Sequence, residues 1–485
     1  MKRIVLTLLL GTALAGCSMD PKLETPAAPV PPGWPVGDAY LKANEAALPT
    51  VTYQDIFRDP RLQKLIETAL ANNRDLRIAA ANIAAARAQY RIQRADRFPG
   101  LDAGAGLTAS RGSTTGTGTT GGNSGATRTS WSADVSVPAF ELDLFGRVAS
   151  LTRAEQNRWF ATEAAARATR LTLIGDIAAA WLNHAADASL LKIAQDTAAN
   201  AERSVKLTDL RLKGGVAPRT DLAQAQQTLA SAQSDVAAQT TALAQDVNAL
   251  RLLVGAEIEP ALLSSAIEEA APTVAELPAG VDSGVLLRRP DVVQAEYTLR
   301  AANAEIGAAR AALFPRISLT GLLGFASNAL SSLFTSDGFR WSGGASGSYS
   351  IFNAGAGRAG VQVSEAQRDA ALATYEKSIQ TAFREVADAL ARRGTIADQL
   401  KADTANLTAA QDNYRLSEAR YRGGIDNFLA NLIAQRSYYT AQRGLVSTRL
   451  IEATNLVTLY RTLGGDSLLT TTSSGPQPVS QPATP

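Results

Sequence analysis

Long stretches of the chain carry apolar residues at helical spacing, and short stretches with alternating apolar and polar residues interrupt them twice. Apolar positions recur at i, i+3 and i+4 across residues 60–97 and 290–313, a pattern typical of amphipathic helices. The same spacing continues across residues 148–213 and 358–422, and each stretch restarts as a further helix after a Gly-Gly pair. At 1.5 Å per residue, residues 148–213 would span roughly 100 Å as a helix. The pattern predicts a mostly helical chain with long helical hairpins.

Four segments alternate instead between apolar and polar residues: 101–110, 129–138, 316–325 and 339–351. In the last of them, Phe339, Trp341 and Tyr349 share one face with small apolar residues, and serine fills most of the other face. A period of two predicts β-strands that each have one apolar face. Each segment has about ten residues, the length that crosses a bilayer at a tilt.

The order of these elements occurs twice along the chain. Phe98-Pro99 and Phe314-Pro315 each separate a helical stretch from an alternating one. Each long helical stretch ends at a similar turn, Arg211-Leu212-Lys213-Gly214-Gly215-Val216 or Arg420-Tyr421-Arg422-Gly423-Gly424-Ile425. We therefore predict an internal duplication with hairpin tips at 213–218 and 422–427. The first repeat is predicted over residues 60–270 and the second over residues 271–465. A disordered C-terminal tail is predicted over residues 466–485.

The first residues indicate export and lipid attachment. Met1-Lys2-Arg3 is basic, residues 4–13 are apolar but too few for a lasting membrane span, and Leu14-Ala15-Gly16-Cys17 matches a bacterial lipobox. This pattern predicts a signal peptide over residues 1–16, N-acyl and diacylglycerol groups on Cys17, and a lipid-anchored, Pro-rich extended tether over residues 17–59. A secretory signal that contains a buried cysteine is the alternative. Ser18 follows the cysteine in place of the Asp that retains lipoproteins in the inner membrane, which favours the outer membrane.

Composition and charge argue against several function classes. Apolar residues make up 46% of the chain and aromatic residues only 6%, so alanine supplies much of the apolar count, as in closely packed long helices. The chain has 47 Lys and Arg against 45 Asp and Glu, which leaves no sustained basic field for nucleic acid. The sequence has no phosphate-binding loop, nucleophile motif or Cys/His cluster, and its lone histidine is His184. We expect no enzyme, no metal and no cofactor other than the lipid on Cys17.

The alternating segments predict a barrel that several chains share. No run of about 18 apolar residues follows the signal, so the mature chain could cross a membrane only as strands. Four strands cannot close a barrel, and an open edge in lipid would leave backbone groups unpaired. Several chains would each supply two hairpins, whose small polar residues would face a wet lumen. A soluble sheet and an ordinary soluble coiled-coil hairpin are the alternatives for these elements.

Four motifs together resemble those of TolC-type outer-membrane factors, specifically the NodT-like lipoproteins of tripartite efflux pumps. The motifs are Phe140-Glu141-Leu142-Asp143-Leu144-Phe145-Gly146-Arg147, Leu286-Leu287-Arg288-Arg289-Pro290-Asp291, Gly307-Ala308-Ala309-Arg310-Ala311-Ala312-Leu313-Phe314-Pro315-Arg316-Ile317-Ser318-Leu319 and Arg420-Tyr421-Arg422-Gly423-Gly424-Ile425-Asp426-Asn427-Phe428-Leu429. The likeness covers nearly all of the mature chain. It implies a homotrimer whose twelve-stranded β-barrel, with four strands per chain, continues into a long periplasmic α-helical barrel. A mixed equatorial band would come from the Pro60 region, residues 256–284 and the C-terminal segment.

The resemblance also implies the function. The chain would be the outer-membrane channel of a tripartite efflux system, a passive duct that exports drugs or other toxic small molecules. Its partners would be a periplasmic adaptor protein, an inner-membrane pump of the RND type, and the lipid of a Gram-negative outer membrane. A duct for type I protein secretion and a non-conducting structural envelope lipoprotein are the alternatives.

The same resemblance implies a periplasmic gate near the second tip. Arg420 and Tyr421 match the positions of polar latches, and Leu429 matches an apolar constriction ring. Ile433 stands where relatives place an acidic ring, so we expect a more apolar gate with weaker cation selectivity unless Asp426 substitutes. Glycine would supply the positive φ of the turns at the tips. The turn residues expected to contact the adaptor are Gly214, Gly215, Val216, Ala217, Gly423, Gly424 and Ile425.

Overall fold

The computed structural model describes residues 19–23, 27–35, 37, 39–40, 52–111, 127–275 and 283–479. The expected signal peptide, the lipidation site Cys17 and most of the loop that follows the first strand lie outside these residues. The chain divides into two compact units, each built from three separate stretches of sequence. Among the described residues, none of the helices combines the length and apolar character that a membrane crossing requires.

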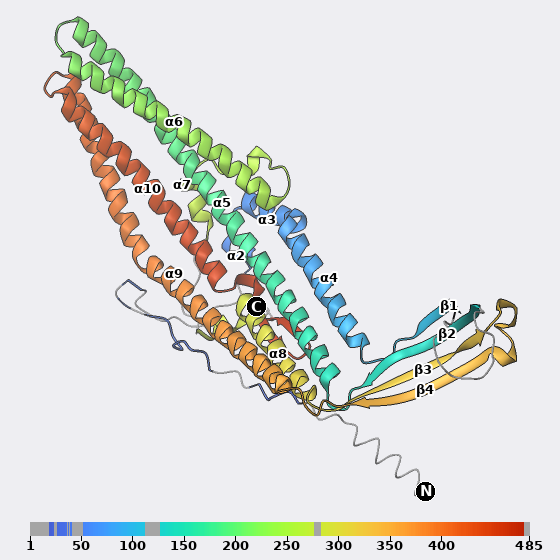
Figure 1. Ribbon diagram of the computed structural model, residues 1–485. Helices are drawn as coiled ribbons and strands as arrows, with labels where there is room; N and C mark the ends of the chain where they lie inside the picture. The colour runs from blue at the N-terminus through green and yellow to red at the C-terminus, as the bar shows by residue number, and fades with distance from the viewer. Residues whose placement is uncertain are drawn as a thin grey trace. The chain divides into compact units, whose positions relative to one another are not determined.

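The first unit draws on residues 1–26, 83–161 and 296–374 and contains an antiparallel four-stranded sheet (Figure 1). Its strands, in sheet order, are β1 (Asp102–Arg111), β2 (Thr127–Leu142), β3 (Arg316–Ser327) and β4 (Phe339–Ser348). The alternating pattern predicted all four strands, but the prediction that β2 ends at Pro138 is wrong. The strand continues through a register shift between Val137 and Phe140, which accommodates a proline that cannot donate to the neighbouring strand.

The register brings the predicted apolar positions together on one face of the sheet. Leu323 of β3 lies opposite Val135 of β2 on one side and opposite Trp341 of β4 on the other. Residues paired across antiparallel strands project to the same side of a sheet. Val135, Leu323 and Trp341 are 47%, 56% and 73% exposed, so no other described part of the chain covers this apolar face.

The opposite face carries small polar side chains and single charges. Asp134 of β2 and Arg340 of β4 form an ion pair of 3.5 Å across the strand that lies between them. Gly324 of β3 pairs with both residues, and a Cβ atom at this position would lie 2.5 Å from the Cβ of Asp134. Glycine is therefore required for this ion pair to pass over β3.

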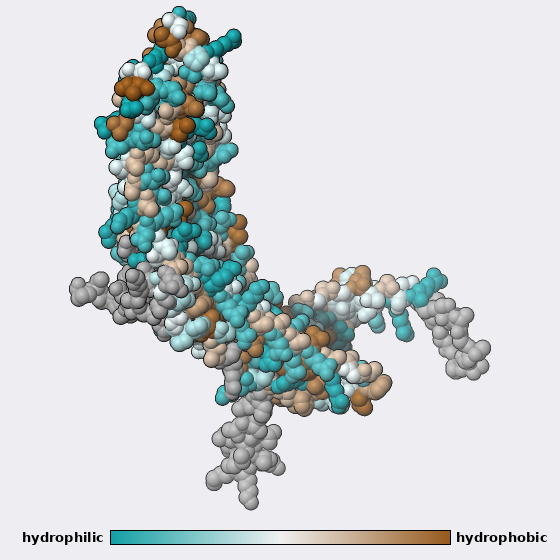
Figure 2. Space-filling model, turned by 90° about the vertical axis from the view of Figure 1, so that its left-hand side faces the viewer, coloured by the Kyte–Doolittle hydropathy of each residue, from teal (hydrophilic) through white to brown (hydrophobic). Residues whose placement is uncertain are grey.

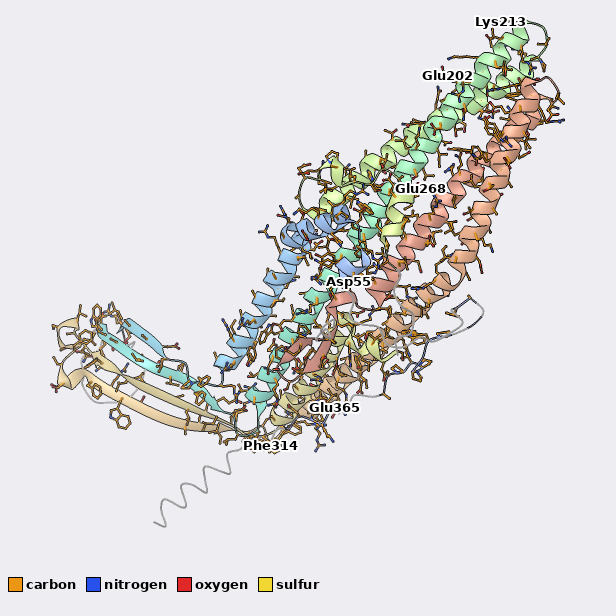
Figure 3. The ribbon with its side chains drawn as sticks, turned by 180° about the vertical axis from the view of Figure 1, so that it is seen from behind. Asp55, Glu202, Lys213, Glu268, Phe314 and Glu365 are labelled. Atoms are coloured by element: carbon orange, nitrogen blue, oxygen red, sulfur yellow. The ribbon has the colours of Figure 1, made fainter. Side chains whose placement is uncertain are left out.

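Parts of four helices complete the first unit: α4 (Arg74–Ala95), α5 (Arg147–Lys213), α8 (Pro290–Ala311) and α9 (Ala356–Arg422). Aromatic pairs hold these helices together. Trp159 of α5 stacks on Tyr90 of α4 with ring centroids 5.7 Å apart, and Phe160 meets the edge of Tyr297 of α8 at 5.4 Å. Phe314, labelled in Figure 3 where α8 gives way to β3, stacks on Phe145 at 4.7 Å.

The second unit draws on residues 27–82, 162–295 and 375–485 and contains two helical hairpins. In one hairpin α5 pairs with α6 (Arg219–Val254), and in the other α9 pairs with α10 (Phe428–Thr462) (Figure 1). The helices α5 and α9 have the same length, 67 residues each. The helical periodicity of the sequence therefore predicted these elements to within a few residues.

The apolar core of the second unit lies where the hairpins meet short elements. These elements are α2 (Tyr53–Ile56), α3 (Pro60–Asn72), η1 (Pro260–Leu262), α7 (Ile267–Ala270) and η2 (Ala271–Thr273). Trp181 of α5 is fully buried, and its Nε1 donates to the carbonyl of Leu262 at 2.9 Å. His184 is buried one turn further on, with Nδ1 3.2 Å from the carbonyl of Ser264, and this burial lowers its pKa. Both side chains pack against the irregular stretch between the repeats.

The sequence pattern did not predict the break between α3 and α4. Asn73 has an extended backbone, and its Oδ1 accepts the backbone N–H groups of Asp75 and Leu76, as an N-cap residue does. Its Nδ2 donates to the carbonyl of Leu253 at the end of α6. One side chain thus begins α4 and holds it to α6, whereas we predicted one continuous helical stretch from residue 60 to 97.

The end of the chain also differs from the expected disordered tail. After η6 (Gly465–Ser467), β5 (Leu469–Thr472) and β6 (Gly475–Pro478) pair as an antiparallel hairpin. Leu469 is completely buried, and the carboxylate of Asp466 pairs with Arg170 of α5 at 2.7 Å. An apolar anchor and a charged contact therefore order residues 465–478 within the second unit.

Candidate functional site at the helical turns

The turn between α5 and α6 is a Schellman motif. The N–H of Val216 donates to the carbonyl of Arg211 at 2.9 Å, and the N–H of Gly215 donates to that of Leu212 at 3.0 Å. Gly215 has a φ of 72°, a left-handed conformation that glycine adopts without strain. The turn leads into α6 at Pro218, which is the residue before the first helical position. Lys213, the last residue of α5, is labelled beside this turn in Figure 3.

The turn between α9 and α10 repeats the same construction. The N–H of Ile425 donates to the carbonyl of Arg420 at 2.9 Å, and the N–H of Gly424 donates to that of Tyr421 at 3.0 Å. Gly424 has a φ of 74°. The side chain of Asn427 then accepts the N–H of Ala430 and begins α10. The sequence predicted both turns from their glycine pairs, and the geometry gives the physical reason for the second glycine of each pair.

Arg420 closes the second turn with its side chain as well as with its carbonyl. Its Nε and Nη2 donate to the two carboxylate oxygens of Asp426 at 2.7 and 2.9 Å, a bidentate ion pair. These hydrogen bonds lower the pKa of Asp426 and raise that of Arg420. Asp426, the candidate substitute for the acidic ring, is therefore neutralised by Arg420 in this conformation.

Tyr421 links the two hairpins. The side chain is 4% exposed and lies against Phe428, with ring centroids 5.5 Å apart, in a cluster with Ala225 of α6 and Leu432. Its hydroxyl lies 3.5 Å from Oγ1 of Thr208 on α5. Thr208 already donates to the carbonyl of its own helix at Ser204, so Tyr421 is the donor in this weak contact.

Arg211 also binds Tyr421, and the sequence analysis missed this residue. Its guanidinium lies 4.6 Å from the centre of the tyrosine ring, and its Nη1 donates to the Tyr421 carbonyl at 3.2 Å. The sequence did contain a signal, because Arg211 occupies the same place before its Gly-Gly pair as Arg420. Where the second turn has Asp426, however, the first has Ala217, so Arg211 lacks a carboxylate in its own turn and reaches across to α9.

Four of the other predicted gate and tip residues have exposed apolar side chains. Leu429 and Ile433 lie one turn apart on α10 and are 50% and 57% exposed. Val216 and Ile425, at the two turns, are 74% and 68% exposed. Figure 2 shows apolar side chains, in brown, gathered at the top of the view, where the turns of the hairpins lie. The turns therefore combine buried links between the hairpins with apolar surface on the outside.

The described residues contain no group of three or more His, Cys, Asp or Glu side chains that could hold a metal ion. The chemistry at the turns is that of ion pairs, ring contacts and apolar surface. Ion pairs and ring contacts can break and form again when two helices change their packing, and an exposed apolar surface can bind another protein.

Comparisons with known proteins agree on one family. A family model described as "Outer membrane efflux protein" matches residues 65–256 and 283–465. The toluene efflux pump outer membrane protein TtgC of Pseudomonas putida is 44% identical to this chain over 454 residues, or 93% of each chain. Outer membrane protein OprJ of Pseudomonas aeruginosa is 39% identical over 461 residues, or 95% of each chain.

The fold is also similar to that of a solved channel. The crystal structure of the open state of the Neisseria gonorrhoeae MtrE outer membrane channel matches with a TM-score of 0.80 and 34% sequence identity. The match covers 93% of this chain and 98% of that chain. These findings confirm the resemblance to TolC-type outer-membrane factors. The chain belongs to the outer membrane efflux protein family.

Proposed function

We propose that the chain is the outer-membrane channel of a tripartite efflux system, a passive duct that exports toxic small molecules. The sheet of the first unit is the observation that carries this proposal. Its apolar face is uncovered, its opposite face is polar, and its outer strands β1 and β4 pair with no further strand among the described residues. A soluble sheet would bury the apolar face against another layer, whereas a bilayer would cover it without any further element.

Assembly of three chains would complete this sheet. The free edge of β4 in one chain would pair with the free edge of β1 in the next, which satisfies the backbone groups that lipid cannot. Four strands per chain give a barrel of twelve, and the small polar face with Asp134 and Arg340 would line the lumen. The strands and hairpins of residues 60–270 and 271–465 would be the two copies of an internal repeat.

Exposed aromatic residues support the position of the membrane surface. Trp341, Tyr349 and Phe352 are 73%, 60% and 86% exposed, and they lie on β4 or within four residues of its end. Aromatic side chains prefer the interface between lipid and water. With the strands in the outer membrane of a Gram-negative bacterium and Cys17 carrying the lipid, the helical hairpins would extend into the periplasm.

The helical turns would form the gate and the docking point. Arg420 stabilises the turn of the second hairpin, and Tyr421 links this hairpin to the first. In a trimer, Leu429 and Ile433 would form apolar rings across the lumen. An adaptor protein would contact the turns at Gly214–Ala217 and Gly423–Ile425, and an inner-membrane pump of the RND type would supply the energy. The names of the relatives, which are efflux pump outer membrane proteins, support this assignment.

Conductance of the purified mature protein in planar lipid bilayers tests the duct. Arg420→Ala removes the bidentate pair with Asp426 and should raise the fraction of time in large-conductance states about tenfold, the effect of one charge-assisted hydrogen-bonded pair. Arg415→Ala is the matched control, because Arg415 pairs with Asp412 on the exposed surface of the same helix. A protein that conducts in none of these forms would be a structural spacer, and the duct would be rejected.

The same recordings test the apolar gate. With Ile433 in place of an acidic ring, multivalent cations at millimolar concentration should block the wild-type channel weakly. Ile433→Asp should create a ring of three carboxylates in the trimer and increase the block, because oxygen ligands bind such cations. Strong block of the wild type would show that another carboxylate, Asp426 first, acts as the selectivity ring.

A further inference from the structure

The segment that follows Cys17 is docked in the first unit. Asp20 lies against the first turns of α5, where its Oδ1 accepts the hydroxyl of Ser150 at 2.7 Å and its Oδ2 accepts Nε of Arg153 at 2.7 Å. Ser150 is completely buried, and the Asp20 side chain is 18% exposed, so this hydrogen bond is largely shielded from water. Charge-assisted hydrogen bonds in such surroundings are stronger than those at an open surface.

A second helix holds the next residue. Asn303 of α8 is 6% exposed, and its Nδ2 donates to the carbonyl of Pro21 at 2.8 Å. The contacts of Asp20 and Pro21 thus come from two helices, α5 and α8, that are far apart in the sequence. A segment held through its side chain by one helix and through its backbone by another has a defined position within the predicted extended tether of residues 17–59.

Gly307 of α8 makes room for the segment. A Cβ atom at this position would lie 1.8 Å from Oδ1 of Asp20 and 2.9 Å from its backbone nitrogen. Real Cβ contacts do not approach this closely, and the second contact is with backbone that cannot rotate away. The groove therefore accepts Asp20 only because residue 307 has no side chain.

We propose that residues 19–22 form a strap that fixes the lipid anchor to the base of the first unit, with Gly307 as the notch for Asp20. The proposal rests on the proposed lipidation of Cys17. Asp20 follows Cys17 by three positions, and an extended chain spans at most about 3.6 Å per residue, so a docked Asp20 would limit the reach of a lipid on Cys17 to about 11 Å. The strap would thus keep the attachment point of the lipid near Ser150 and Gly307, where β2 ends and α5 begins.

The position of the strap would determine where the membrane surface meets the first unit. The strands β1 to β4 and the strap belong to the same unit. A fixed anchor would hold the membrane surface at the level of the first turn of α5. Acyl chains and strands would then enter the bilayer from the same level, and the lipid would resist displacement of the barrel along the membrane normal.

Trypsin cleavage of the full mature protein in detergent tests the strap. Cleavage after Lys22 releases the peptide of residues 17–22, which mass spectrometry can follow with its attached acyl groups. Proteases need a locally extended and detached backbone, so docking should protect the bond after Lys22. Gly307→Ala and Asp20→Ala should each release the peptide about tenfold faster or more, as expected for loss of a charge-assisted contact.

Gly360→Ala is the matched control, because Gly360 lies on helix α9 of the same unit and a Cβ atom there meets nothing within 4 Å. It should leave the rate within about twofold of the wild type, since alanine in an open helical position costs nothing. If the Gly307→Ala variant does not assemble, the Asp20→Ala variant still tests whether the strap is docked, because this substitution changes only the N-terminal segment. Wild-type rates in both variants, or a wild type cleaved as fast as a synthetic peptide of residues 18–27, would overturn the strap. A protected peptide without acyl groups would instead refute lipidation and leave the docking intact.

Discussion

Carboxyl groups at individual positions have very different surroundings in this protein. Asp426 is stabilised as an anion by Arg420, whereas burial and the neighbouring Asp187 raise the pKa of Asp246 on α6 to about 6. One carboxylate oxygen of Asp246 is buried without a hydrogen-bond partner. Ionisation of Asp246 therefore opposes folding, because the native state holds the proton more tightly than the unfolded state does.

Stability should fall as the pH rises through the range in which Asp246 ionises. A carboxyl group whose pKa is higher in the folded state stabilises the protein below its unfolded pKa and loses that contribution as the pH passes about 6. Asp246→Asn should raise the free energy of unfolding by about 1 kcal/mol at pH 8 and change it little at pH 4, with a partly hydrated site reducing the full effect. Thermal unfolding at both pH values measures this.

Asp196→Asn is the control for this comparison, because Asp196 forms an exposed pair with Lys192 on α5. It should alter stability only slightly at either pH. Equal effects of the two substitutions at pH 8 would contradict the assigned environment of Asp246.

The limits of sequence reasoning are clearest at single residues. Arg420 and Asp426 lie six positions apart in one turn, so their pairing belongs to a local motif that the sequence contains. Arg211 and Tyr421 lie on different helices, and only the packing of one hairpin on the other brings them together. The contact between Asp20 and Gly307 likewise could not be predicted from their positions in the sequence.

At the scale of elements, periodicity predicted the long helices and the four strands because apolar residues recur at the spacing of each element over many residues. Interruptions were harder to predict, since they depend on single side chains. Asn73 breaks a helical stretch by capping the next helix, and Pro138 bends β2 without ending it. Leu469 orders a tail whose composition suggests disorder, because it finds a buried site that local sequence does not reveal.

The turns allow a direct test of this element-level account. Gly424→Ala places a Cβ atom at a φ of 74° and should destabilise the protein by about 1 kcal/mol. Gly444→Ala, in the interior of α10 where a Cβ atom meets nothing within 4 Å, should stabilise it by a similar amount. Denaturant unfolding of both variants provides the measurement. Effects of the same sign would show that conformation does not explain the glycine at the turn.

For the whole molecule, sequence pattern and family resemblance together predicted a mostly helical chain with the fold of outer-membrane efflux channels, and the trimeric barrel stays a prediction. The two unpaired edges of the sheet are consistent with the proposed multi-chain barrel, but they do not specify how many chains would close it. The proposed docking surface for an adaptor protein would likewise be formed by the assembled chains, and the apolar turns only suggest its position.

A photoactivatable crosslinker at Ala217 tests the docking surface in intact cells. The position is half-buried at the first turn and next to the exposed Val216, so a probe there samples whatever covers the tip. We expect a covalent adduct with the periplasmic adaptor in cells that express the complete pump. A crosslinker at Ser364, near the other end of α9 and far along the chain from the tips, should give no such adduct. An absence of adduct at Ala217 would remove the tips from the docking site.

The unpaired outer strands β1 and β4 also have a consequence for biogenesis. A solitary chain cannot place this sheet in lipid, because two rows of N–H and C=O groups would lose water and gain no partner. In the proposed barrel, newly exported chains would therefore have to meet one another before or during insertion, and until then each would carry two unpaired strand edges. The yield of finished channels should consequently depend steeply on the rate of synthesis and on the holding chaperones that keep those edges apart.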